Sequence, residues 1–310
     1  TVLTTAPAAF AQETVKIGIL TSYSGISSLG GQQADIAIKL FQQKHGNTPG
    51  GFKLEWVKRD LGGPNPEVAK RLATELITRE KVQLIFGPDF TPNVLAVAPL
   101  ITEAKVPAVV TGAATQGIIG EKSPYYMRTF FSIPQLVRPA AQWAWKNNLR
   151  KPFLLIADYG PGHDSEATFN KTWTELGGQV AGTVRVPVRN PEFSSFMQRI
   201  KDASPDFVFV FLPIGELSVQ FLKAFADSGL KASNIKLVGT GDIVDEAYIE
   251  AAGDAALGAI TTGIYSTQHD SPLNKQFVTE FSGAAGKQRM GWSSVVAWDT
   301  LRVIYNGLEA

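Results

Sequence analysis

The chain has 310 residues, of which 44% are hydrophobic and 18% are charged, as expected for one large or two medium globular domains. Its 29 basic and 28 acidic residues nearly balance and form no basic cluster, which argues against nucleic acid or an anionic membrane surface as a partner. The absence of cysteine excludes disulfides, thiolate metal sites and cysteine nucleophiles.

The N-terminal residues 1–12 are small and apolar. They contain Ala9-Phe10-Ala11, which matches the A-x-A pattern before a signal-peptidase cleavage site. A more charged segment with strand-like alternation starts at Glu13. We therefore interpret residues 1–11 as a signal-peptide remnant and predict an exported, periplasmic protein, with an Ala/Thr-rich arm as the alternative. Beyond this segment no run approaches the roughly 20 apolar residues of a membrane-spanning helix.

Short β-branched or aromatic runs alternate with segments of helical spacing along nearly the whole chain. Most of the runs are continuously apolar, which favours strands buried on both faces of a parallel sheet. In chain order, strands are predicted at residues 15–20, 53–57, 82–86, 107–111, 153–157, 182–186, 207–212, 236–239 and 259–265. Helices are predicted around residues 34–41 and at residues 66–81, 91–104, 134–148, 163–177, 191–203, 216–228, 272–285 and 293–308.

Repeated βα units imply right-handed crossovers and a doubly wound α/β sheet. About nine strands are too many for one such sheet in a chain of this length. Two extended stretches, at residues 127–134 and 259–268, interrupt the βα rhythm and are the expected crossings between two lobes. We predict two doubly wound parallel-sheet lobes joined by a hinge, the N-terminal lobe formed by residues 12–131 plus 265–310 and the C-terminal lobe by residues 132–264.

Side chains for catalysis or metal binding are sparse. The three histidines lie far apart in sequence, and the pair His163-Asp164 is more typical of a solvated loop than of a metal site. Neither a G-x-S-x-G elbow nor a Walker A motif occurs, and the short Gly-x-Gly turns do not complete a dinucleotide-binding motif. An enzyme would have to use Asp242, Asp158 or His163. We therefore predict no metal, no cofactor and no catalytic activity.

Small hydroxyl-bearing residues gather where strands of the first lobe end. These segments are residues 21–28, 87–91 and 111–115, and two of them lead into predicted helices. In a doubly wound fold, ligands bind beyond the carboxyl ends of the strands. Backbone N–H groups and a helix N-terminus can together hold a carboxylate without a cationic side chain. The pattern favours binding of a small carboxylate over catalysis.

At these residues the chain resembles the branched-chain amino acid (Leu/Ile/Val) binding proteins of ABC uptake systems, which have the type I periplasmic binding protein fold. The order and spacing of several short motifs carry the resemblance: Ile17-Gly18, Ser24-Gly25, residues 84–88, Val106-Pro107, residues 112–115 and Tyr126-Met127-Arg128-Thr129. The resemblance implies a monomeric binding protein that delivers its ligand to an ABC transporter membrane permease. It also implies a further segment after the last helix, returning to the second lobe.

The resemblance implies that Thr91 and the turn Gly112, Ala113, Ala114, Thr115 hold the ligand carboxylate, beside Phe90. The family acid that binds an α-ammonium falls at Gly241, with Asp242 adjacent. Family aromatics are replaced by Leu29 or Gly30 and by Ile214. The family tyrosine falls at Tyr159 or is lost to Gly162, next to His163. The predicted ligand-binding residues are Leu29, Phe90, Thr91, Gly112, Ala113, Ala114, Thr115, Tyr159, His163, Ile214, Gly241 and Asp242.

The positions at which this chain differs from the family indicate which ligand it binds. A buried ammonium without a carboxylate partner is costly, and smaller side chains enlarge an apolar pocket. An aromatic or similarly hydrophobic carboxylic acid is therefore the favoured ligand. A branched-chain or other hydrophobic amino acid is the alternative, provided that Asp242 reaches the ammonium. A ligand-sensing receptor module is the alternative from a different class of protein.

Overall fold

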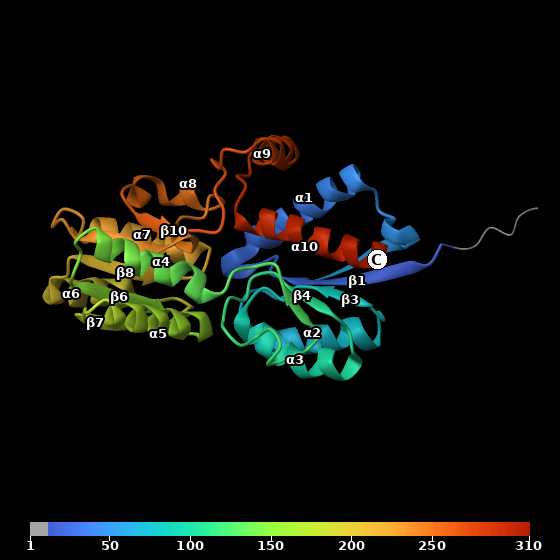
Figure 1. Ribbon diagram of the computed structural model, residues 1–310, viewed down its shortest axis with the longest axis horizontal. Helices are drawn as coiled ribbons and strands as arrows, with labels where there is room; N and C mark the ends of the chain where they lie inside the picture. Colours follow the sequence, from blue (N-terminus) through green and yellow to red (C-terminus); the bar gives the residue numbers. More distant parts are fainter. Residues whose placement is uncertain (1–11) are drawn as a thin grey trace, which may run out of the picture.

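The computed structural model describes residues 12–310, which form two lobes, each built on a five-stranded sheet (Figure 1). The first sheet has the order β2-β1-β3-β4-β5 and the second the order β10-β9-β8-β6-β7. All neighbouring strands in these sheets are parallel, so the predicted fold class is confirmed. The strands are β1 Thr14–Thr21, β2 Lys53–Asp60, β3 Leu84–Phe86, β4 Ala108–Val110, β5 Tyr126–Arg128, β6 Pro152–Ala157, β7 Gly182–Val186, β8 Phe207–Phe211, β9 Lys236–Thr240 and β10 Ile260–Thr262.

Helices cover both faces of each sheet, which explains why the strands are continuously apolar. They are α1 Ser28–His45, α2 Pro66–Thr78, α3 Thr91–Ala104, α4 Ile133–Lys146, α5 Gly160–Glu175, α6 Phe193–Ala203, α7 Glu216–Asp227, α8 Ile249–Ala252, α9 Pro272–Ala285 and α10 Trp292–Glu309. In the first lobe, α2 and α3 pack on one face and α1, α9 and α10 on the other. In the second lobe, α6 and α7 pack on one face and α4 and α5 on the other. Among residues 12–310, no helix has the length and apolarity needed to cross a membrane.

The strand β5, which was not predicted from the sequence, overlaps the start of the predicted break at residues 127–134. β5 is a short edge strand, paired only with β4, and three residues are too few to show a strand pattern. The chain then enters α4, whose N-cap is Ser132. The predicted strand at residues 259–265 is shorter, because only β10 pairs, and the following residues lead to α9. The lobe boundaries stay a prediction, and the proposed signal-peptide remnant lies outside the described residues.

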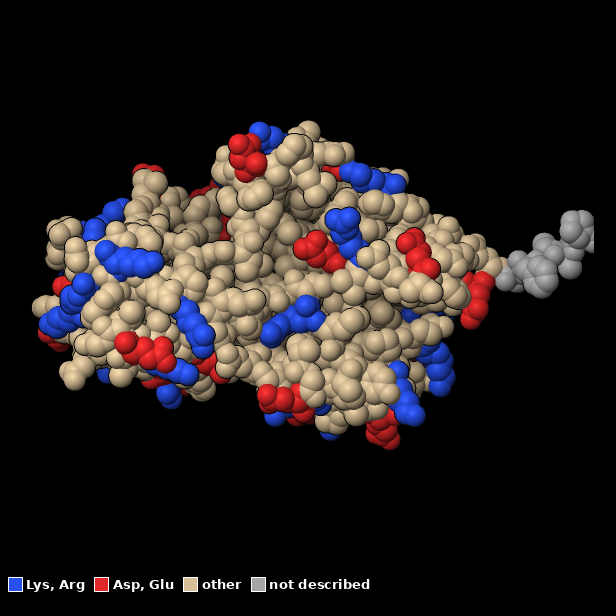
Figure 2. All heavy atoms as spheres, in the orientation of Figure 1, with Lys and Arg blue, Asp and Glu red and all other residues tan. Residues whose placement is uncertain are grey.

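Charged side chains of both signs are interspersed on the face seen in Figure 2, without a large patch of one sign. This distribution accords with the near-neutral composition of the chain.

Candidate functional site

The carboxyl ends of both sheets face one cavity between the lobes. The two sheets have equivalent strand orders, so each has a switch point, at β1/β3 in the first and β6/β8 in the second. Ligands of doubly wound folds bind at such switch points. The cavity is lined by residues that follow β1, β3, β4, β6, β8 and β9, and it measures about 830 Å³ including the part open to solvent.

The first lobe contributes an end of the cavity that is rich in hydrogen-bond donors. Thr91 is the first residue of α3 and is buried, and its hydroxyl donates to Thr115 Oγ1 at 3.3 Å. The backbone N–H groups of Thr91 and of the turn Gly112–Thr115 donate to no acceptor within residues 12–310. A Cβ at Gly112 would lie 2.4 Å from the carbonyl oxygen of Asp89, so only glycine fits this close approach. Such a set of free donors at a helix N-terminus suits an anion.

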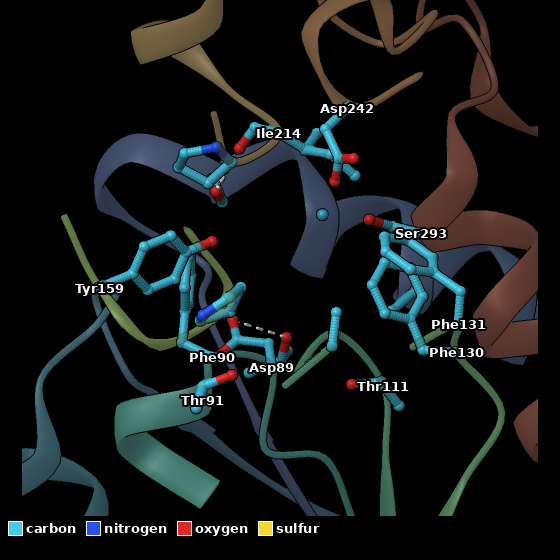
Figure 3. Close-up of a pocket in the computed structure, with 18 of the residues that line it drawn as sticks. Asp89, Phe90, Thr91, Thr111, Phe130, Phe131, Tyr159, Ile214, Asp242 and Ser293 are labelled. Atoms are coloured by element: carbon cyan, nitrogen blue, oxygen red, sulfur yellow. Dashed lines mark hydrogen bonds between the residues drawn. The ribbon is translucent and has the colours of Figure 1, made fainter. Parts of the chain in front are cut away.

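Aromatic rings form the walls. Phe86, Phe90, Phe130, Phe131, Tyr159 and Phe211 all line the cavity. Tyr159 lies on one side of the cavity and Phe130 and Phe131 on the other (Figure 3). The rings of Tyr159 and Phe211 are nearly parallel, with an interplanar angle of 24° and centroids 6.3 Å apart. The space between these walls suits a flat apolar body.

Two carboxyl groups line the cavity from different lobes. Asp89 accepts hydrogen bonds from the backbone N–H of Ser22 at 2.8 Å and from the Thr21 hydroxyl at 3.4 Å, while its Oδ1 has no partner. Asp242 is only 5% exposed, and its Oδ2 has no partner either. Burial raises the pKa of both groups, that of Asp242 to about 7. No lysine, arginine or histidine of the described chain lines the cavity.

Seven of the twelve residues predicted from the sequence line this cavity: Phe90, Thr91, Gly112, Ala114, Tyr159, Ile214 and Asp242. Thr115 is not among the lining residues but accepts a hydrogen bond from the Thr91 hydroxyl. Ala113 is fully buried in the hydrophobic core of the first lobe. Leu29 does not line the cavity, whereas its neighbour Gly30 does. The backbone N–H of Leu29 donates to the Tyr248 hydroxyl at 3.3 Å.

Two other predicted residues are not among those that line the cavity, for different reasons. Gly241 packs against the indole of Trp292, where a Cβ would lie 2.4 Å from the ring. His163 is exposed, and its Nε2 lies 2.7 Å from Asp158 Oδ1. The lining residues Phe130, Phe131, Tyr248, Ser293 and Asp89 were not among those predicted from the sequence. The adjacent aromatics at 130 and 131, in a stretch that carries no strand or helix period, were the available signal.

The lobes touch each other around the cavity. Ser27 Oγ donates to the carbonyl oxygen of Ile214 at 2.7 Å, and the N–H of Gln116 donates to Asp164 Oδ2 at 2.9 Å. Gly215 lies so close to the first lobe that a Cβ on it would be 2.0 Å from the carbonyl oxygen of Ile26. The structure therefore has the lobes closed over the cavity.

Residues 14–310 match the family described as "Periplasmic binding protein". The chain is 40% identical over 306 residues to Leu/Ile/Val-binding protein homolog 6 of Brucella melitensis biotype 1, covering 98% of this chain and 78% of that protein. These matches confirm the resemblance seen in the sequence.

Solved structures show the same similarity. A solute-binding protein of an ABC transporter from Rhodopseudomonas palustris BisB5, in complex with 3,4-dihydroxybenzoic acid, is 42% identical with a TM-score of 0.91, covering 96% of this chain and 80% of that one. An R. palustris solute-binding protein in complex with 4-hydroxybenzoate is 44% identical with a TM-score of 0.92, covering 96% and 81%. Another from R. palustris, in complex with benzoate, is 28% identical with a TM-score of 0.88, covering 96% and 81%. The chain belongs to the periplasmic binding protein family.

Proposed function

We propose that the protein is the periplasmic solute-binding component of an ABC uptake system and holds an aromatic carboxylic acid between its lobes. The cavity supports this proposal because it combines free N–H donors at the start of α3 with aromatic walls. The donors suit a carboxylate and the walls suit a ring. The ligands of the R. palustris proteins, all of them benzoates, agree with both features.

The rest of the proposal follows from the family and from the contents of the cavity. Export to the periplasm and delivery to a membrane permease are the ordinary roles of the family to which residues 14–310 belong. We propose no reaction, because the cavity is built to enclose a ligand with dipoles and rings rather than to transfer a proton or an acyl group. A monomer remains our prediction for the oligomeric state.

A hydrophobic amino acid is the second candidate ligand. The name of the Brucella relative favours it, and so does Asp242, which could pair with an ammonium. The absence of a cation in the described lining does not distinguish the two candidates, since both ligands bring a carboxylate.

Isothermal titration calorimetry with benzoate, 4-hydroxybenzoate and leucine tests the proposal. We expect both benzoates to bind and leucine to give no heat. Because ligand binding raises apparent stability by mass action, the melting temperature should rise with the same compounds. Binding of leucine alone would overturn the proposal in favour of the amino acid.

A further inference from the structure

We propose that Asp242 accepts a hydrogen bond from a hydroxyl group on the ligand ring, opposite the carboxylate, and that the cavity therefore selects hydroxyl-bearing aromatic acids over benzoate. This inference rests on the proposed function and assigns a role to Asp242, the acid with which the second lobe lines the cavity in the described chain.

The proposed role of Asp242 rests on a carboxylate oxygen that has no hydrogen-bond donor. Asp242 is buried at the end of β9, in the 3-10 helix Gly241–Val244, and it lines the cavity. Its Oδ2 has no hydrogen-bond partner, and neither has the neighbouring Thr240 Oγ1. A buried carboxylate without a donor is unfavourable, and native structures rarely leave one unpaired. A donor supplied by the ligand would satisfy it.

The position of Asp242 favours a hydroxyl over an α-ammonium. In Figure 3, Asp242 and Thr91 lie at opposite ends of the cavity, with Tyr159 on the wall between them. The carboxylate and ammonium of an α-amino acid are attached to the same carbon, so they cannot reach both ends together. A benzoate with a hydroxyl across the ring presents its two polar groups in opposite directions, and its flat body fits between the aromatic walls.

The surroundings of Asp242 make the site sensitive to a missing donor. In the described chain no cationic side chain lines the cavity, and the nearby charge of Asp245 opposes ionisation of Asp242. Burial raises the pKa of Asp242 to about 7 and outweighs the stabilising contributions of nearby donors, so a further donor from the ligand would stabilise the carboxylate. Sites built to bond a ligand hydroxyl reject analogues that lack it, and we expect benzoate to bind about 10- to 100-fold more weakly than 4-hydroxybenzoate.

Calorimetric titration of the wild type, Asp242→Leu and Asp89→Asn with 4-hydroxybenzoate, benzoate and leucine tests this assignment. Asp242→Leu should weaken 4-hydroxybenzoate binding and leave benzoate binding unchanged or tighter, which abolishes the preference. Retained benzoate binding shows that the variant is folded. Asp89→Asn is the matched control, because it alters the other cavity acid and should affect both ligands by the same factor.

The possible outcomes distinguish the role of Asp242 from the proposed function. Equal affinities of the wild type for benzoate and 4-hydroxybenzoate would overturn the role of Asp242 and leave the proposed function intact. So would a preference for 4-hydroxybenzoate that persists in Asp242→Leu. Binding of leucine with no binding of either benzoate would overturn both.

Discussion

Replacing Gly215 by alanine should prevent the lobes from closing. Gly215 is the N-cap of α7 and has φ +135°, ψ −160°, a conformation that is essentially restricted to glycine. An added Cβ would lie 2.0 Å from the carbonyl oxygen of Ile26, which belongs to the 3-10 helix Gly25–Ser27 of the other lobe. The lobes would have to separate by about 1 Å or more to restore ordinary van der Waals contact. Separation would break the adjacent hydrogen bond from Ser27 to Ile214.

The expected loss can be stated separately for affinity and for stability. One lost hydrogen bond corresponds to about 0.5–1.5 kcal/mol, and incomplete closure adds lost burial of the ligand, so Kd should rise at least about tenfold. The strained backbone should lower the free energy of unfolding by about 1–3 kcal/mol, whether or not the lobes are closed. Calorimetry with 4-hydroxybenzoate measures the first effect and thermal unfolding the second, while small-angle X-ray scattering reports closure.

Gly229→Ala is the matched control. Gly229 also has a positive φ, +78°, but a Cβ on it would have no neighbour within 4 Å. This variant should lose stability and keep its affinity. The steric argument for closure would be refuted if Gly215→Ala bound the ligand as tightly as Gly229→Ala and became equally compact on binding.

Three further predictions concern the ligand and the contacts between lobes. Thr91→Val keeps the shape of the side chain but removes a hydroxyl from the anion-binding end, so calorimetry should show benzoate binding about 10- to 100-fold weaker; an unchanged Kd would exclude Thr91 from that end. Burial raises the pKa of Asp242 to about 7 in the closed structure. We expect opening of the lobes to hydrate this carboxyl and lower its pKa, so the closed benzoate complex should hold more protons than the open protein and benzoate affinity should fall as pH rises toward about 7. A ligand hydroxyl offsets this loss, so the preference for 4-hydroxybenzoate should grow from about pH 5.5 to about pH 8 in titrations of the wild type, and a flat ratio would contradict the assignment. Arg289→Ala removes the ion pairs that the half-exposed Arg289 makes with Glu246 and Glu250, and it should raise Kd no more than about fivefold, an effect that added salt should abolish in the same assay.

Much of the fold could be predicted because its signals are local. Continuous apolar runs marked the buried strands, and proline at the start of helices such as α2 and α3 marked where they begin. β5 escaped notice because its three residues pair at a sheet edge. The first-lobe end of the site could also be predicted from the sequence, because Thr91, Gly112 and Ala114 follow strands whose carboxyl ends lie at the same edge of the sheet.

The rest of the site depends on contacts between distant segments. Phe130 and Phe131 reach the cavity only because the chain crosses between lobes directly after β5. The match of Gly241 to a family acid did not reveal that the indole of Trp292, from α10, occupies the adjacent space. His163 lies near Tyr159 in sequence, yet it faces solvent from α5. Sequence spacing alone cannot predict which side chain a helix distant in the sequence places beside the cavity.

The convergence of the sheet ends has an electrostatic consequence. The helices α3, α5 and α7 begin at Thr91, Gly160 and Glu216, and Thr91, Pro161 and Ile214, which lie in or just before their first turns, line the cavity. The positive ends of three helix dipoles therefore lie beside one cavity. Their field comes from the backbone and does not depend on the protonation of any side chain. Mobile ions screen buried dipoles far less than they screen surface charges. The dipole contribution to anion binding is therefore a permanent property of the closed fold, and it is separate from the pH-dependent effect of Asp242.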